Sequence, residues 1–78
     1  MKRNWIVISH NRHRDDKYVV LINATLEEAE AKEREIADKE GWLEYTEAAK
    51  YGYGDYGLSE EYYVCLRELE SDEVVIAK

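Results

Sequence analysis

The sequence predicts a two-layer α+β domain in which one α-helix packs on one face of an antiparallel β-sheet of four to five strands. Three observations lead to this fold. Short runs of β-branched and aromatic residues lie before and after the centre of the chain, which is typical of strands. Residues 25–40 carry the start and stop signals of a helix. The length of 78 residues suits one small domain, 1–78. The predicted element order is β-β-α-β-β.

Two apolar segments near the N-terminus predict a β-hairpin. Residues 5–9 and 17–23 are rich in valine and isoleucine, and the polar residues 10–16 separate them. Five to seven residues is a usual length for a strand and is short for a helix. Because the polar stretch is longer than a two-residue turn, we expect a hairpin with an extended loop.

The next segment predicts the helix. Thr25 and Glu28 form the S/T-x-x-E pattern of a capping box, in which each side chain accepts a hydrogen bond from the other residue's backbone. Gly41 is well placed to end the helix. The stripe expected to face the sheet is narrow and consists mostly of small residues, which suits a helix on a sheet better than a helical bundle. This stripe contains Leu26, Ala29, Glu33, Ile36, Ala37 and Glu40.

The second half of the chain predicts the remaining strands. Residues 42–46 are expected to form a third strand, and 47–51 are compatible with one helical turn. Glycines mark a loop up to about residue 59, and the alternating pattern over 61–69 predicts a further strand. A short apolar segment, 73–77, would add a fifth strand.

The charge of the chain is negative and unevenly distributed. Eleven Lys and Arg against 18 Asp and Glu give a net charge of −7, which argues against direct nucleic-acid binding. Residues 1–17 carry +3, from five basic and two acidic residues, whereas 25–40 carry −4, from three basic and seven acidic residues. We therefore expect a polarised molecule with a basic first hairpin. Its basic residues are Lys2, Arg3, Arg12, Arg14 and Lys17.

The helix carries enough carboxylates to form a negative band along its length. The alternative is an ordinary solvated face, because Lys and Arg four residues away can balance part of this charge. As a functional surface, the band would dock into the nucleic-acid channel of a protein. Its members are Glu27, Glu28, Glu30, Glu33, Glu35, Asp38 and Glu40.

Tyrosines gather in the acidic region that follows the helix. Six of the seven tyrosines lie between residues 45 and 63, and a glycine-rich loop cannot bury all of those that it carries. Exposed tyrosines supply large contact areas at low cost in side-chain entropy. The loop is expected either to bind a partner or to fold back over the open face of the sheet. The expected partner-binding residues are Glu27, Glu30, Tyr51, Tyr53, Asp55, Tyr56, Glu60 and Glu61.

No pattern in the chain predicts an enzyme, a cofactor or a metal site. Residues 52–57 match G-x-G-x-x-G but lack the flanking strand and helix of a dinucleotide site. His10 and His13 have no preset ligand geometry. Cys65 is the single cysteine, so it forms no internal disulfide, and nothing beside it in sequence indicates a lowered pKa. The apolar runs are too short to span a membrane, so we expect a cytoplasmic protein without membrane contact.

The layout resembles that of a known group of small proteins. A strand hairpin is followed by the helix start Ala-Thr-Leu-Glu-Glu-Ala at residues 24–29 and then by returning strands, all within a short acidic chain. This arrangement over residues 4–70 is similar to small proteins of bacteriophages and mobile elements, among them several type I anti-CRISPR proteins. The resemblance implies a non-enzymatic inhibitor that occupies a surface of a CRISPR effector complex, often the surface that takes DNA.

Two functions are therefore expected from the sequence. The first is a phage-type inhibitor in the host cytoplasm, a DNA mimic whose acidic, tyrosine-rich surface binds a bacterial nucleic-acid-handling complex and blocks access of nucleic acid. Either the acidic face or the basic first hairpin would make the contact. The alternative is a small structural or accessory protein that self-associates through its sheet, for instance as a homodimer, with no connection to nucleic acid.

Overall fold

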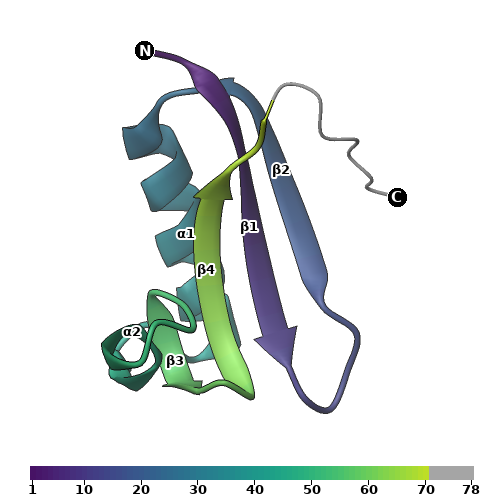
Figure 1. Cartoon of the computed structure of the whole chain (residues 1–78), viewed down its shortest axis with the longest axis vertical. Coiled ribbons are helices and arrows are strands. Elements are labelled where there is room, and N and C mark those ends of the chain that lie inside the picture. The colour runs from purple at the N-terminus through teal and green to yellow at the C-terminus, as the bar shows by residue number, and fades with distance from the viewer. Residues whose placement is uncertain (71–78) are drawn as a thin grey trace.

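The strands of the protein form one antiparallel sheet in the order β2-β1-β4-β3 (Figure 1). The computed structural model describes residues 1–70, and the fifth strand expected over 73–77 lies outside the described residues. The α+β fold class and the order β-β-α-β-β are confirmed. The elements are β1 (Arg3–Asn11), β2 (Lys17–Ala24), α1 (Leu26–Glu40), α2 (Glu47–Lys50), β3 (Tyr56–Ser59) and β4 (Tyr62–Glu68).

The register of the central strands determines which side chains face α1. Val7 lies opposite Leu66, and Ser9 lies opposite Val64. Val7 and Val64 form the buried core with Ala37 of α1. Because side chains alternate along a strand, neighbouring residues such as Cys65 point to the other face of the sheet. Figure 1 shows α1 behind the sheet and no helix in front of β1 and β2. We call this front face the open face because no helix covers it, although Ile6 on it is buried at 7% exposed.

The helix lies close to the sheet because its inner stripe is made of small residues. Ala29 and Ala37 are completely buried, as the sequence predicts. Larger side chains close the core around them. These are Leu21, Ile36, Trp42, Leu43, Tyr56 and Leu66.

Local signals fix both ends of α1. The hydroxyl of Thr25 accepts a hydrogen bond from the N–H of Glu28 at 3.1 Å, and the carboxylate of Glu28 accepts one from the N–H of Thr25 at 2.8 Å. This second bond is the main reason why the pKa of Glu28 is lowered. Gly41 ends the helix with a φ of 85° and donates to the carbonyls of Ala37 and Asp38. The predicted capping box and terminal glycine are both confirmed.

The segment after α1 differs from the prediction. Residues 42–46 form turns instead of a strand, because Trp42 and Leu43 both pack against the core and so do not alternate between two faces. Thr46 makes a single parallel bridge to Gly57. The helical turn expected over 47–51 is present as α2, and the third strand is β3, inside the segment expected to be a loop.

Gly57 explains why a strand can form in this glycine-rich segment. Its φ is 136°, and a Cβ atom there would lie 2.1 Å from the carbonyl oxygen of Tyr62. A side chain at this position would push β3 away from β4. Gly54 of the same pattern also lies close to β4, because a Cβ atom there would be 2.8 Å from the carbonyl oxygen of Val64, whereas Gly52 has open space around it. Two of the three glycines in the G-x-G-x-x-G pattern therefore have a structural role, which is to bring the loop and β3 close to the backbone of β4.

Candidate partner-binding surface

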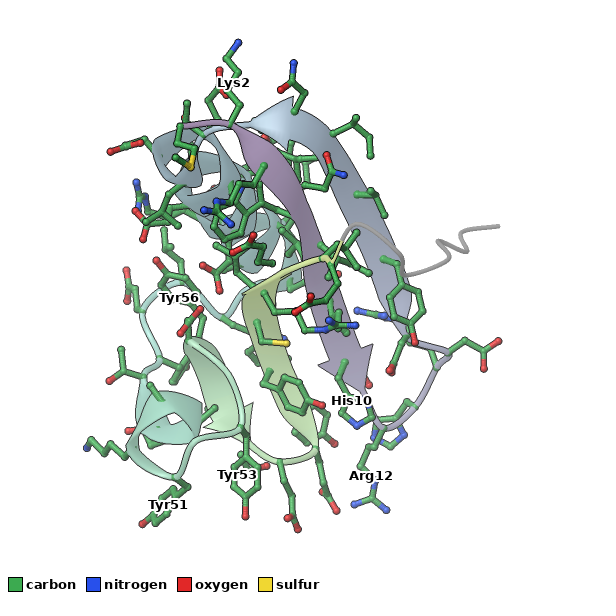
Figure 2. The ribbon with its side chains drawn as sticks, turned by 45° about the horizontal axis from the view of Figure 1, so that its top comes forward. Lys2, His10, Arg12, Tyr51, Tyr53 and Tyr56 are labelled. Carbon is green, nitrogen blue, oxygen red and sulfur yellow. The ribbon has the colours of Figure 1, made fainter. Side chains whose placement is uncertain are left out.

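Four of the predicted partner-binding residues line one depression on the surface. It has a volume of about 430 Å³ and lies between the end of α2 and the β3–β4 turn. Tyr51 is 72% exposed and Tyr53 is 43% exposed. Figure 2 shows both rings projecting outward at the same end of the molecule. We call this the tyrosine depression; it is lined by Tyr51, Tyr53, Leu58, Ser59, Glu60 and Glu61.

A tyrosine and a carboxylate are coupled within the tyrosine depression. The negative charge of Glu60 and a side-chain hydrogen bond between the two residues raise the pKa of Tyr53. The phenol therefore stays protonated at neutral pH and donates to the carboxylate. Glu61 has a different environment, because Arg12 donates to its Oε1 at 3.0 Å. Glu60 thus supplies the uncompensated negative charge of this depression, and Glu61 is half of an ion pair.

The other four predicted residues lie outside the tyrosine depression. Tyr56 is half-buried and packs against the hydrophobic core. Asp55 lies beside the buried Glu33 of α1. Glu27 and Glu30 are exposed on the first turns of α1, a helix of 15 residues that extends about 22 Å at 1.5 Å per residue. The fold therefore divides the predicted set into a tyrosine depression, a carboxylate pair near the core and a separate group on the helix.

The acidic band of α1 is narrower than the sequence predicts, because two of its carboxylates turn inward. Glu33 is only 4% exposed. The side chain of Glu40 is 15% exposed, and it accepts from Arg14 at 2.5 Å and lies 3.9 Å from Lys17. The prediction that all seven carboxylates form one negative band is therefore wrong for Glu33 and Glu40. Both occur in the stripe predicted to face the sheet, and this was the signal for their inward orientation.

Glu33 is the most perturbed acid of the described chain. Burial is the main cause, followed by a hydrogen bond to Asp55 and the charges of Asp55 and Glu30, and together they raise its pKa to about 9, although Arg34 opposes the shift. One carboxyl oxygen, Oε2, is buried without a hydrogen-bond partner among residues 1–70. Glu33 is therefore protonated at neutral pH, and its carboxyl group forms a hydrogen bond that links α1 to Asp55 in the loop before β3.

The basic first hairpin does not form a separate positive pole. Arg3 pairs with Glu68 at 2.8 Å, and Arg12 pairs with Glu61 at 3.0 Å. Arg14 and Lys17 both contact Glu40. The separation of charge along the chain is thus largely cancelled in space. Much of the negative surplus remains on exposed carboxylates of α1, of the α1–α2 connection, of α2 and of the β3–β4 turn, which include Glu27, Glu28, Glu30, Asp38, Glu44, Glu47 and Glu60.

The two histidines have different partners. Nδ1 of His10 lies 2.6 Å from Asp16, and its ring stacks on Tyr63 with 5.0 Å between centroids. His13 contacts the hydroxyl of Tyr62 at 3.1 Å through Nε2. Over residues 1–70, the structure assembles no group of three or more side chains suited to hold a metal ion.

Cys65 lies half-buried on the open face of the sheet. Burial, and then the charges of Asp55 and Glu33, raise the pKa of its thiol, which keeps the thiol protonated and weakly nucleophilic. None of the helices in residues 1–70 has the length and apolar character needed to cross a membrane.

Comparisons with protein-family models, with curated proteins and with solved structures found no match to this chain.

Proposed function

We propose that this protein is a non-enzymatic inhibitor that binds a bacterial nucleic-acid-handling protein, such as a CRISPR effector complex, and blocks its access to nucleic acid. The contact surface in this proposal is the tyrosine depression with the exposed carboxylates around it. The observation that carries the proposal is the pair of exposed tyrosines beside the uncompensated charge of Glu60.

The tyrosines suit the role of anchors. Tyr51 and Tyr53 present large amphipathic side chains with few rotatable bonds, and such residues contribute strongly to binding at the centre of interfaces. Leu58 is 40% exposed in the same depression and adds apolar area between them. A partner that inserts a side chain here would remove all three from water.

The surrounding carboxylates favour a basic partner. Exposed acids raise the association rate with a positively charged surface, and they complement the groups that such a surface normally offers to phosphates. The arginines of the first hairpin are already paired with Glu61, Glu40 and Glu68, so they do not offset this negative field. Binding through this surface should therefore weaken as the salt concentration rises.

Capture from a bacterial lysate that contains CRISPR and restriction complexes would test the proposal. The tagged full chain is compared with a variant carrying Tyr51→Ala, Tyr53→Ala and Glu60→Gln, and with the control Tyr18→Ala, which removes an exposed tyrosine from β2. We expect capture of a nucleic-acid-binding protein by the wild type and the control, loss of capture with the triple variant, and competition by duplex DNA. Capture that survives 0.5 M salt and the triple substitution would overturn the proposal.

A further inference from the structure

The outer edge of β2 is uncovered in the described part of the chain. β2 is a terminal strand of the sheet and pairs on one side with β1. The opposite terminal strand, β3, is shielded, because the N–H of Gly57 donates to the carbonyl of Tyr45 at 3.0 Å and Thr46 bridges to the same glycine. Within residues 1–70, two strand edges therefore offer backbone groups to another strand: the part of β4 beyond Val64, which β3 does not reach, and β2, which is the longer of the two.

Most of this edge lacks the features that normally prevent strand pairing. Edge strands are commonly protected by charges, prolines or bulges. Residues 18–24 contain no charged residue and no proline. Lys17 stands at the beginning of the strand and lies 3.9 Å from Glu40. The register shift between Arg3 and Trp5 places two β2 residues, Ile22 and Asn23, opposite one residue of β1, and Asn23 has a φ of 58°. The pairing with β1 is regular from Lys17 to Leu21, and the irregularity begins at Ile22.

Three of the five exposed side chains of β2 are apolar or aromatic, and the other two, Lys17 and Asn23, lie near the ends of the strand. Ile22 is 65% exposed, Tyr18 is 56% exposed and Val19 is 37% exposed. They lie on both faces of the strand, because Val19 is on the α1 side with Val7, whereas Tyr18 pairs with Ile8 on the open side. A partner that continues the sheet would cover apolar surface on both faces as well as the backbone edge.

Charge indicates what kind of partner fits. The chain has a net charge of −7, so two copies repel each other wherever the carboxylates of one copy lie close to those of the other. Figure 1 shows α2 and β3, which flank the acidic tyrosine depression, on the opposite side of the sheet from β2. The uncharged β2 edge is thus a surface that two copies can share without bringing those carboxylates together.

We propose that two copies of this chain pair through β2 in an antiparallel, two-fold symmetric contact centred on Val20. This arrangement places Val20 opposite Val20, Val19 opposite Leu21, and Tyr18 opposite Ile22 of the other copy. Residues facing each other in antiparallel strands share a face, so this register keeps α1 of both copies on the same side of a continuous sheet. The proposal does not depend on the proposed inhibitor function.

The contact is expected to be weak. Pairing of one strand edge buries less area than the roughly 1,200–2,000 Å² of a standard stable interface, so we expect a dissociation constant in the micromolar range. Salt should strengthen the dimer, because it screens the repulsion between two acidic copies. This response is opposite to that expected for the inhibitor contact, so the two proposals can fail separately.

Cysteine cross-linking tests the register. In a Cys65→Ser background, Val20→Cys places two cysteines opposite each other, with Cα atoms about 4.5–5.5 Å apart, which a disulfide can span. Val19→Cys is the matched control, because position 19 faces position 21 of the other copy. We expect at least tenfold more disulfide dimer from Val20→Cys under mild oxidation. Val19 is the more exposed of the two, so random collisions would favour the control, and equal or reversed yields would overturn the register.

Sedimentation of the full-length chain tests the dimer itself. Ile22→Lys introduces a charge at an exposed position of β2 and should weaken the dimer at least tenfold, whereas Leu58→Lys does the same on β3 and should not. Circular dichroism confirms that both variants fold. A wild-type chain that stays monomeric up to about millimolar concentration in 0.5 M salt would overturn the proposal, and this is the result expected if another segment or an unrelated peptide occupies the β2 edge.

Discussion

Replacing Glu33 with glutamine tests the buried carboxyl group at the centre of the fold. The Glu33→Gln side chain has nearly the same shape as a protonated glutamic acid, and its amide can donate to Asp55 as the protonated carboxyl does. The difference is that glutamine never ionises. The variant should therefore match the wild type at low pH and be more stable at high pH.

The magnitude follows from the pKa. The unfolded chain loses the Glu33 proton near the ordinary value of 4.5, whereas the folded chain holds it up to about pH 9. Between these values the unfolded state binds fewer protons, so the free energy of unfolding falls as the pH rises. The slope is about 1.4 kcal/mol per pH unit, which gives at most about 4 kcal/mol between pH 5 and pH 8. A domain of this size has a total stability of only about 4–12 kcal/mol.

Urea unfolding of both proteins from pH 5 to pH 8 measures this effect. The wild-type stability should fall more steeply than that of Glu33→Gln, and thermal scans should show the same order, because 1 kcal/mol changes the Tm by roughly 4–8 °C in a small domain. Glu27→Gln is the matched control, since it removes an exposed carboxylate of the same helix that is not among the groups acting on the pKa of Glu33. Parallel pH profiles of the wild type and Glu33→Gln would show that Glu33 is not buried as a protonated acid.

Substitutions at Gly57, Thr25 and Arg14 test the strand contact, the helix cap and the buried ion pair. Gly57→Ala should lower the free energy of unfolding in urea by about 3 kcal/mol or more, because a Cβ atom there meets the backbone of Tyr62. Gly52→Ala should lower it by only about 1–2 kcal/mol, because Gly52 has a φ of 82° but open space around it. Equal losses for the two variants would contradict this account. Thr25→Ala should lower the free energy of unfolding by about 1 kcal/mol, because it removes the capping box. An unchanged urea midpoint would argue against a stabilising role of this cap. Arg14→Met should lower the free energy of unfolding by about 1–3 kcal/mol, because its partner, the carboxylate of Glu40 on α1, is mostly buried. Arg3→Met, which breaks the exposed pair with Glu68, should lower it by less than about 1 kcal/mol. A larger loss for Arg3→Met would refute this ranking.

The elements that depend on neighbouring residues could be predicted from the sequence. The capping box of Thr25 and Glu28 lies within four residues, and Gly41 follows the last turn directly, so both ends of α1 were predictable. β1 and β2 followed from their apolar runs. The third strand was misplaced because Trp42 and Leu43 have the composition of a strand, yet both are drawn into the core at the end of α1. β3 depends instead on the close approach of Gly57 to β4, and composition alone does not show this approach.

The candidate surface was predictable in its residue types but not in its grouping. The sequence by itself determined the net charge, the clustering of tyrosines along the chain and the presence of glutamates in the inner stripe of α1. Only the tertiary structure decided that Arg12 pairs with Glu61, 49 residues away, and that Glu33 lies beside Asp55. The physical reason is that the sum of charges is additive along the chain, whereas the pKa and the pairing of each group depend on burial and on distances between segments, which exist only once the sheet and α1 have come together.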